Sequence, residues 1–88
     1  MRLDKFLKVS RLIKRRTVAN EVSDQGRVFI NDKSAKPANP VKEGDKITIQ
    51  YYNKSVTVEV LKVPTGNVSI QESKDLYKII EEKQHTSE

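Results

Sequence analysis

The stretch RLDKFLKVSRLIKRRTVANEV, residues 2–22, decides the fold and holds the densest run of bases in the chain. Leu3, Phe6 and Leu7 recur at helical spacing, and at about 100° per residue they fall on one side of a helix. The basic residues that fall on the other side are Arg2, Lys5 and Lys8. The pattern predicts a short amphipathic helix over Met1–Val9 with an exposed basic face.

A second helix is predicted to begin at Thr17. The Thr17 hydroxyl can accept a free backbone N–H of the first helical turn, which is the role of an N-cap. Val18, Ala19 and Val22 stand at positions i, i+1 and i+4, so we expect them to face inward. Gly26 is expected to end the helix, because glycine adopts the left-handed backbone of that position at little cost.

The middle of the chain alternates in the manner of short β-strands. A strand is predicted over Arg27–Asn31, with a turn at Asn31-Asp32, where both side chains tolerate a left-handed backbone. Two further strands are predicted where apolar residues stand at every second position. These residues are Ile47, Ile49 and Tyr51 in one run and Val56, Val58 and Val60 in the next. The short polar link between the two runs predicts a hairpin.

The C-terminal part is predicted to be helical. Leu76, Ile79 and Ile80 are spaced as the inner side of a short helix over Lys74–Lys83. Ser73 stands just before this segment and is a candidate for its cap.

The order of two helices followed by strands predicts an α+β fold, and 88 residues suffice for one small domain. Two N-terminal helices packed on a small antiparallel sheet would make up that domain over residues 1–62. A C-terminal extension would follow over residues 63–88, with the short helix and a loose polar tail from Gln84 onward.

The formal net charge of +5 is informative because of its position. Residues 1–16 hold seven bases against one acid, Asp4, whereas the rest of the chain is close to balanced. The seven bases are Arg2, Lys5, Lys8, Arg11, Lys14, Arg15 and Arg16. An excess of charge at one end is typical of a protein that contacts phosphates.

Catalysis has little support in the residue types. Cysteine is absent, and the one histidine, His85, lies in the polar tail. The three glycines form no phosphate-binding loop, and no cluster has the spacing of metal ligands. We therefore expect a binding protein that is not an enzyme and needs neither metal nor cofactor.

A basic N-terminus has other uses as well. It occurs in membrane-surface helices and targeting presequences, but here the apolar side is short and continues into a core. Helix-turn-helix binding of duplex DNA is an alternative for two short basic helices, against which the β-rich remainder argues. No apolar run has the length of a membrane span. We expect a cytoplasmic monomer without a membrane partner.

Four segments resemble, in order and spacing, the RNA-binding domain named for ribosomal protein S4. They are Arg2-Leu3-Asp4-Lys5-Phe6-Leu7, Arg16-Thr17-Val18-Ala19, Gly26-Arg27-Val28-Phe29-Ile30-Asn31 and Val41-Lys42-Glu43-Gly44-Asp45-Lys46-Ile47. Standing alone in so short a chain, this domain is most similar to the heat shock protein 15 family. Within that family the acidic C-terminal end favours the branch of small proteins of bacterial ribosome-associated quality control.

The resemblance implies a non-catalytic factor of the free large ribosomal subunit that contacts ribosomal RNA and the peptidyl-tRNA in the P site. In the quality-control branch, a partner of the NEMF type on the same subunit directs C-terminal alanine tailing of the stalled nascent chain. An alternative of another class is a general RNA chaperone or translational regulator unconnected with stalled ribosomes.

The resemblance places the RNA-contacting arginines at Arg2, Arg15 and Arg16, with Asp4 and Thr17 beside them. Arginine suits this task because its planar guanidinium can donate two parallel hydrogen bonds to a phosphate. Further RNA contacts are expected from the other bases of the first sixteen residues and from one amide, namely Lys5, Lys8, Arg11, Lys14 and Asn20.

Asp4 is an acid on a surface that is expected to face phosphates. One hypothesis is that it pairs with Arg15 or Arg16 and holds that side chain ready for RNA. The other is that it stabilises the first helical turn through the helix dipole and pairs with Lys8 at i+4. The sequence leaves both hypotheses open.

Overall fold

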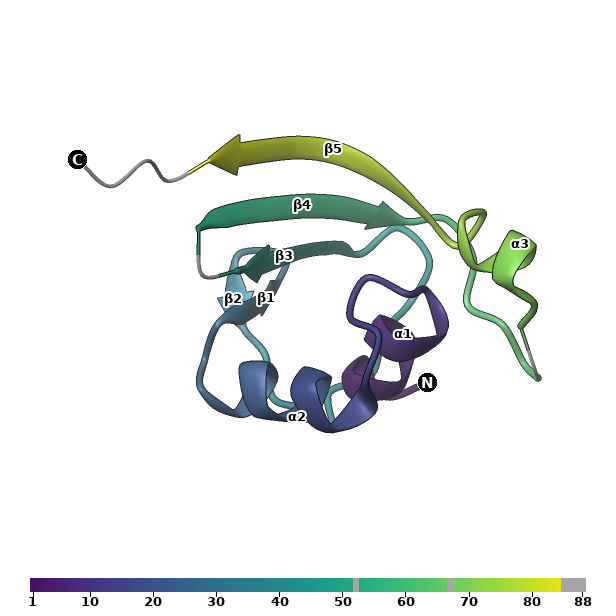
Figure 1. Ribbon diagram of the computed structural model, residues 1–88, viewed down its shortest axis with the longest axis horizontal. Helices are drawn as coiled ribbons and strands as arrows, with labels where there is room; N and C mark the ends of the chain where they lie inside the picture. The colour runs from purple at the N-terminus through teal and green to yellow at the C-terminus, as the bar shows by residue number, and fades with distance from the viewer. Residues whose placement is uncertain (52, 67, 85–88) are drawn as a thin grey trace.

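The computed structural model describes residues 1–51, 53–66 and 68–84. Its helices are α1 (Leu3–Val9), α2 (Arg16–Asp24) and α3 (Ile70–Ser73). Its strands are β1 (Val28–Ile30), β2 (Lys33–Ser34), β3 (Lys46–Gln50), β4 (Lys54–Val60) and β5 (Tyr77–Gln84). The strands form one antiparallel sheet in the order β2-β1-β3-β4-β5. Helices α1 and α2 pack beneath the sheet, while β5 runs along the far edge (Figure 1). This confirms the predicted α+β fold with two N-terminal helices on a small antiparallel sheet.

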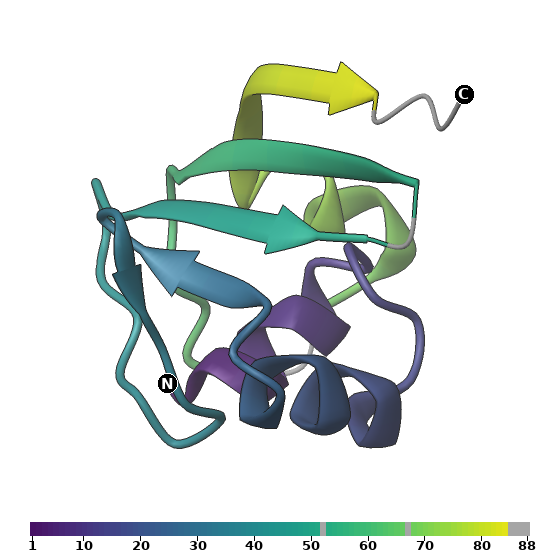
Figure 2. The same ribbon diagram turned by 90° about the vertical axis from the view of Figure 1, so that its left-hand side faces the viewer.

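The apolar side of α1 fills the space between the helices and the sheet. Leu3, Phe6 and Leu7 are fully buried, as the helical spacing predicts. They share one core with buried residues of α2 and of the central strands, among them Ala19, Val28, Ile47, Ile49 and Val58. Burying one such large apolar side chain is worth about 1.5–3 kcal/mol, so α1 contributes strongly to holding the layers together. Figure 2 shows α1 and α2 lying side by side under the sheet.

A loop from the middle of the chain, residues 37–40, holds the start of α1. The backbone N–H of Leu3 donates to the carbonyl of Asn39 at 2.8 Å. The backbone N–H of Asp4 donates to the carbonyl of Pro37 at 3.2 Å. The first N–H groups of a helix have no partner within the helix, so the 37–40 loop supplies the acceptors that α1 lacks.

The start of α2 differs from the prediction in two respects. Arg15 is the N-cap residue and Thr17 lies within the first turn, so the capping role predicted for Thr17 is wrong. Val18 is 41% exposed, so its predicted inward orientation is also wrong. Ala19 and Ser23 are fully buried and occupy the side of α2 that faces the core. Because Val18 lies about 100° around the helix from Ala19, it faces solvent.

The end of α2 follows the prediction. Gly26 has a φ of 76°, in the left-handed region. Its N–H donates to the carbonyl of Ser23 at 3.1 Å, and the N–H of Arg27 donates to the carbonyl of Val22 at 3.1 Å. This pair of bonds is the Schellman motif, in which the residue after the helix must adopt a left-handed backbone.

The turn and the strands predicted in the middle of the chain are confirmed. Asn31 and Asp32 have φ values of 52° and 68° and connect β1 to β2. Strands β3 and β4 form an antiparallel pair. Their alternating apolar residues face the core, and Tyr51 at the end of the first run is half-buried.

The C-terminal segment is a strand where a helix is predicted. β5 pairs antiparallel along β4, so the helix predicted over Lys74–Lys83 is wrong. Only Leu76 of the three supposed inner residues is buried, whereas Ile79 and Ile80 are 52% and 46% exposed. The open edge of β4 offers backbone hydrogen bonds to an extended segment, and this outweighs the local spacing.

A single helical turn, α3, precedes β5. Its N-cap is Ser69, whose side chain accepts the backbone N–H of Glu72 at 3.1 Å. Ser73, the predicted cap, is the last residue of this turn and is buried.

β5 belongs to the same sheet as β1 to β4, so the C-terminal extension is joined to the rest of the fold by backbone pairing. The division of the chain at residue 62 stays a prediction. The loose tail predicted from Gln84 onward is wrong at Gln84 itself, which is the last residue of β5 and pairs with Lys54. The rest of that predicted tail lies outside the described residues. Within the described residues, none of the helices is long and apolar enough to cross a membrane.

Candidate RNA interface

Asp4 lies in the first turn of α1, and its side chain is almost completely buried between α1 and α2. Only 2% of the residue is exposed. Its Oδ1 accepts the backbone N–H of Lys5 at 2.8 Å. Its Oδ2 accepts a hydrogen bond from Nδ2 of Asn20 on α2 at 3.3 Å. Burying a carboxylate is costly unless hydrogen bonds and opposite charges compensate for the lost water, and both are present here.

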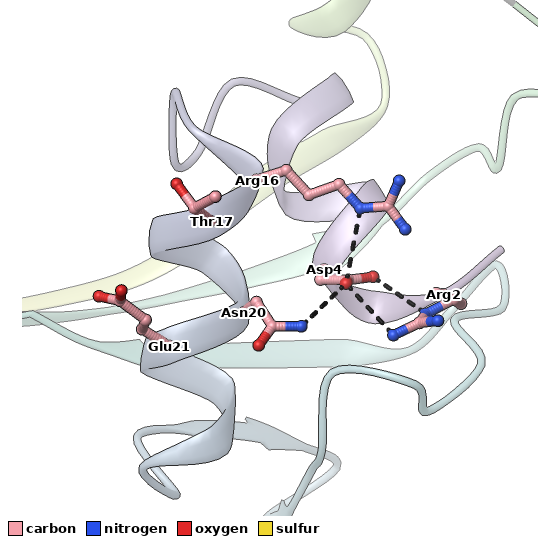
Figure 3. A pocket seen from close by; sticks show the side chains of 6 residues that line it. All are labelled: Arg2, Asp4, Arg16, Thr17, Asn20 and Glu21. Carbon is pink, nitrogen blue, oxygen red and sulfur yellow. Dashed lines mark hydrogen bonds and ion pairs between the residues drawn. The ribbon is translucent and has the colours of Figure 1, made fainter.

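Two arginines converge on Asp4 from different elements (Figure 3). Nε of Arg2 lies 3.3 Å from Oδ1, and Nη2 of Arg2 donates to Oδ2 at 3.4 Å. Nε of Arg16, in the first turn of α2, lies 3.6 Å from Oδ2. Both arginine side chains remain about half exposed, at 51% and 50%. We call Arg2, Asp4, Arg16 and Asn20 the arginine cluster.

The carboxylate of Asp4 is held in its charged form. Burial raises the pKa of Asp4, but the hydrogen bond from Asn20 and the charges of Arg16 and Arg2 oppose this. Together with the backbone N–H of Lys5 they leave the pKa below the ordinary value of 3.8. Asp4 is therefore ionised at neutral pH and can orient both guanidinium groups.

The arginine cluster lines an open pocket of about 480 Å³ between the start of α1 and the outer side of α2. Thr17 and Glu21 complete its described lining. Glu21 was not among the residues predicted for the site. A signal was present, because Glu21 stands one helical turn after Thr17 and four-residue spacing places both on one side of a helix.

The structure bears on both hypotheses for Asp4, which does lie in the first turn of α1 as the second hypothesis assumes. Within the described residues, Asp4 forms ion pairs with Arg2 and Arg16 and none with Lys8 or Arg15. The predicted pairing with Arg16 is thus confirmed, and the pairing with Lys8 is not observed. The amide of Asn20 donates to Asp4, while the residue remains exposed, so its predicted contact with RNA stays a prediction.

The remaining bases of the first sixteen residues lie outside the arginine cluster. Lys5, Lys8 and Arg11 line a separate groove on α1. Lys14 and Arg15 are exposed and line neither cavity. The structure therefore brings Arg2 and Arg16 together and distributes the other bases around them. Contact of any of these residues with RNA stays a prediction.

The turn that carries Lys14 and Arg15 is fixed to the sheet by Tyr51. The hydroxyl of Tyr51, just after β3, donates to the carbonyl of Leu12 at 2.9 Å. Burial raises the pKa of Tyr51, with smaller contributions from Tyr77 and Glu82, so its hydroxyl keeps its proton for this bond. This contact was not predicted from the sequence.

Within the described residues, no group of three or more histidine, cysteine or carboxylate side chains is placed to hold a metal ion. His85 lies outside the described residues. The chemistry available at the arginine cluster is the binding of an anion by guanidinium donors.

Comparisons with known proteins agree with this chemistry. Residues 1–47 match the family model described as S4 domain. A Bacillus subtilis protein named RQC P-site tRNA stabilizing factor is 51% identical over 83 residues, which cover 94% of this chain and 95% of that relative. A protein of the same name from Halalkalibacterium halodurans is 52% identical over 83 residues, covering 94% and 93%. The trimeric crystal structure of Vibrio cholerae heat shock protein 15 has a TM-score of 0.80 at 30% identity, covering 90% of this chain and 80% of that one.

Proposed function

Because this chain belongs to the S4 domain family, and within it to the family of the RQC P-site tRNA stabilizing factors, we propose that it is a non-catalytic RNA-binding protein that contacts P-site tRNA in ribosome-associated quality control. The match covers nearly the whole of this chain and of the relatives, so the proposal concerns the chain as a whole.

The observation that carries this proposal is the convergence of Arg2 and Arg16 on Asp4. Two guanidinium groups meet one buried carboxylate at a half-exposed surface, and Glu21 adds a second acid to the pocket lining. The positive excess around the pocket therefore comes from the other exposed bases of this end of the chain, such as Lys14 and Arg15. Structured RNA is bound largely through its phosphates and 2′-hydroxyls, because its deep major groove is closed to side chains. Guanidinium groups already oriented by Asp4 lose little side-chain freedom when a phosphate binds.

We propose further that the RNA consists of ribosomal RNA of the free large subunit and of the peptidyl-tRNA in the P site. The names of the relatives support contact with the tRNA. The likeness to small quality-control proteins supports contact with the ribosomal RNA. It also supports a NEMF-type partner on the same subunit and a contribution to C-terminal alanine tailing. We propose that the protein acts in the cytoplasm as a single copy.

Gradient sedimentation of cell extract tests the proposal. The wild-type protein is expected to co-migrate with free large subunits, and Arg16→Ala is expected to shift the protein to the light fractions. Lys46→Gln is a matched control, because Lys46 is an exposed base on β3 next to the inward-facing Ile47 and therefore lies on the opposite face of the sheet.

Three results would count against the proposal. If Arg16→Ala sediments as the wild type does, the arginine cluster is not the contact. If Lys46→Gln is lost from the subunit as well, the contact depends on overall charge. Wild-type protein spread among free RNA would favour the general RNA chaperone or translational regulator.

A further inference from the structure

A second groove is lined by residues of α1, of the turn after it and of the loop leading to α3. Figure 1 shows this loop on the side of α1 that faces away from α2. Its volume is about 450 Å³. The described residues that line it are Lys5, Lys8, Val9, Arg11, Gly66, Val68 and Ser69. None of them lines the pocket of the arginine cluster, and none of them is acidic. We call this the α1–α3 groove.

The α1–α3 groove combines two kinds of surface. Val9 and Val68 are half-buried and pack against the hydrophobic core, so they present an apolar floor. Lys5, Lys8 and Arg11 are exposed and place three positive charges around that floor. A ligand that matches both surfaces carries a flat, weakly polar group and negative charges close to it. A nucleotide has this composition.

The backbone of Arg11 supports a functional reason for its side chain. Arg11 follows Ser10, the C-cap residue of α1, and has a φ of 61°; its N–H donates to the carbonyl of Lys8 at 2.9 Å. Glycine is the residue that adopts this left-handed conformation without strain, and an L-residue with a long side chain is disfavoured there. Residues kept in such conformations cluster at binding sites, where the side chain is needed in spite of the strain.

We propose that the α1–α3 groove binds an unpaired RNA nucleotide, with its base against Val9 and Val68 and its phosphates at Lys5, Lys8 and Arg11. A paired base is stacked within the helix and cannot reach an apolar floor, whereas an unpaired base can be turned outward and rest on a side chain or on a guanidinium plane. This inference rests on the proposed RNA-binding function and adds to it a preference for single-stranded RNA.

Two fluorescent RNA probes test the inference by anisotropy at one fixed salt concentration. The first is a fully paired hairpin closed by a tight loop, and the second is the same hairpin with three unpaired nucleotides at its 3′ end. The wild-type protein is expected to bind the second probe about tenfold more tightly, which is the gain that burial of roughly 55 Å² of apolar surface would give. Arg11→Gly is expected to bring this ratio close to one. Lys8→Gln, which leaves the backbone of Arg11 unchanged, is expected to lower it.

Controls keep the possible outcomes apart. Arg11→Gly relieves the left-handed strain, so its thermal unfolding midpoint should equal or exceed that of the wild type, which excludes unfolding as the cause. Lys46→Gln should keep the wild-type ratio. A wild-type ratio of one, or an unchanged ratio in Arg11→Gly, overturns the nucleotide site while leaving RNA binding intact. Failure of the proposed function would instead appear as no binding of either probe.

Discussion

Nδ2 of Asn20 on α2 donates a hydrogen bond of 3.3 Å to Oδ2 of Asp4 on α1. The same oxygen atom lies 3.6 Å from Nε of Arg16 and accepts a hydrogen bond of 3.4 Å from Nη2 of Arg2. One buried atom therefore joins two helices and two arginines. The position of the guanidinium groups depends on how α1 and α2 pack, and unfolding of either helix would separate them.

Asp4→Asn is expected to weaken RNA binding, although the change makes the protein more positive. The neutral amide no longer orients Arg2 and Arg16, and the loss of charge-assisted hydrogen bonds corresponds to roughly a tenfold lower affinity. Fluorescence anisotropy with a tRNA measures the effect. Asp24→Asn is the matched control, since Asp24 is an exposed acid at the end of α2 and its removal changes the net charge equally. A tighter complex in both variants would show that Asp4 acts only through its charge.

The stability of the protein is expected to fall in acid partly through Asp4. The pKa of Asp4 is lowered by folding, so its contribution is fully present above the ordinary value of 3.8 and is lost as the pH falls through the lower folded value. Urea unfolding of the wild type and of Asp4→Asn at pH 7 and pH 3 checks this. The difference in free energy of unfolding between them should shrink at pH 3. An equal difference at both pH values would contradict the prediction.

Tyr51→Phe is expected to lower the free energy of unfolding by about 1 kcal/mol, because the carbonyl of Leu12 loses its hydrogen-bond donor. Urea unfolding measures the loss. Tyr77→Phe is the control, since the Tyr77 hydroxyl makes no side-chain hydrogen bond within the described residues. Equal losses in the two variants would mean that the bond to Leu12 adds nothing.

Gly26→Ala is expected to destabilise the fold by about 1–2 kcal/mol, because alanine is strained at a φ of 76°. The new methyl group causes no steric clash, since a Cβ at Gly26 would lie 3.7 Å from Oγ of Ser34, an ordinary van der Waals contact. Gly66→Ala provides the comparison, because a Cβ there meets nothing within 4 Å. Thermal unfolding of both variants checks the prediction, which fails if they lose the same stability.

The salt dependence of binding is expected to report the phosphates engaged. Contact with about five phosphates gives a slope of log affinity against log salt near −3.5 to −4.5. Arg16→Ala should make this slope shallower by about one phosphate's share, whereas Lys46→Gln should leave it unchanged. Titrations of both variants at several salt concentrations measure the slopes. An unaltered slope for Arg16→Ala would remove Arg16 from the phosphate contacts.

Local patterns in the sequence predict some local features of the fold, although the cap at Thr17 and the inward orientation of Val18 are wrong. The spacing of Leu3, Phe6 and Leu7 and the position of Gly26 depend only on neighbouring residues, and both predictions are confirmed. The helix predicted over Lys74–Lys83 is wrong because the spacing of its apolar residues fits a helix although the segment pairs as a strand. The open edge of β4, which decides its conformation, lies elsewhere in the chain.

In the candidate site, too, some contacts are predicted from the sequence and others depend on how the chain packs. The sequence predicts a pairing of Asp4 with Arg15 or Arg16 as one of two hypotheses, because an acid on a surface that faces phosphates costs attraction, and the structure shows Arg16. The hydrogen bond from Asn20 to Asp4 and the contribution of Val68 to the floor of the α1–α3 groove depend on how distant segments pack. Periodicity and charge along a chain carry no information about such contacts.

The 37–40 loop has a consequence for how the chain tolerates change. Surface connections are ordinarily where insertions and proteolytic cuts do least harm. Here the carbonyls of Pro37 and Asn39 secure the first turn of α1, which carries Asp4 next to Arg2. Lengthening or cleaving this connection would release that turn and displace Asp4, more than thirty residues away in the sequence, so the geometry of the arginine cluster depends on the length of this loop.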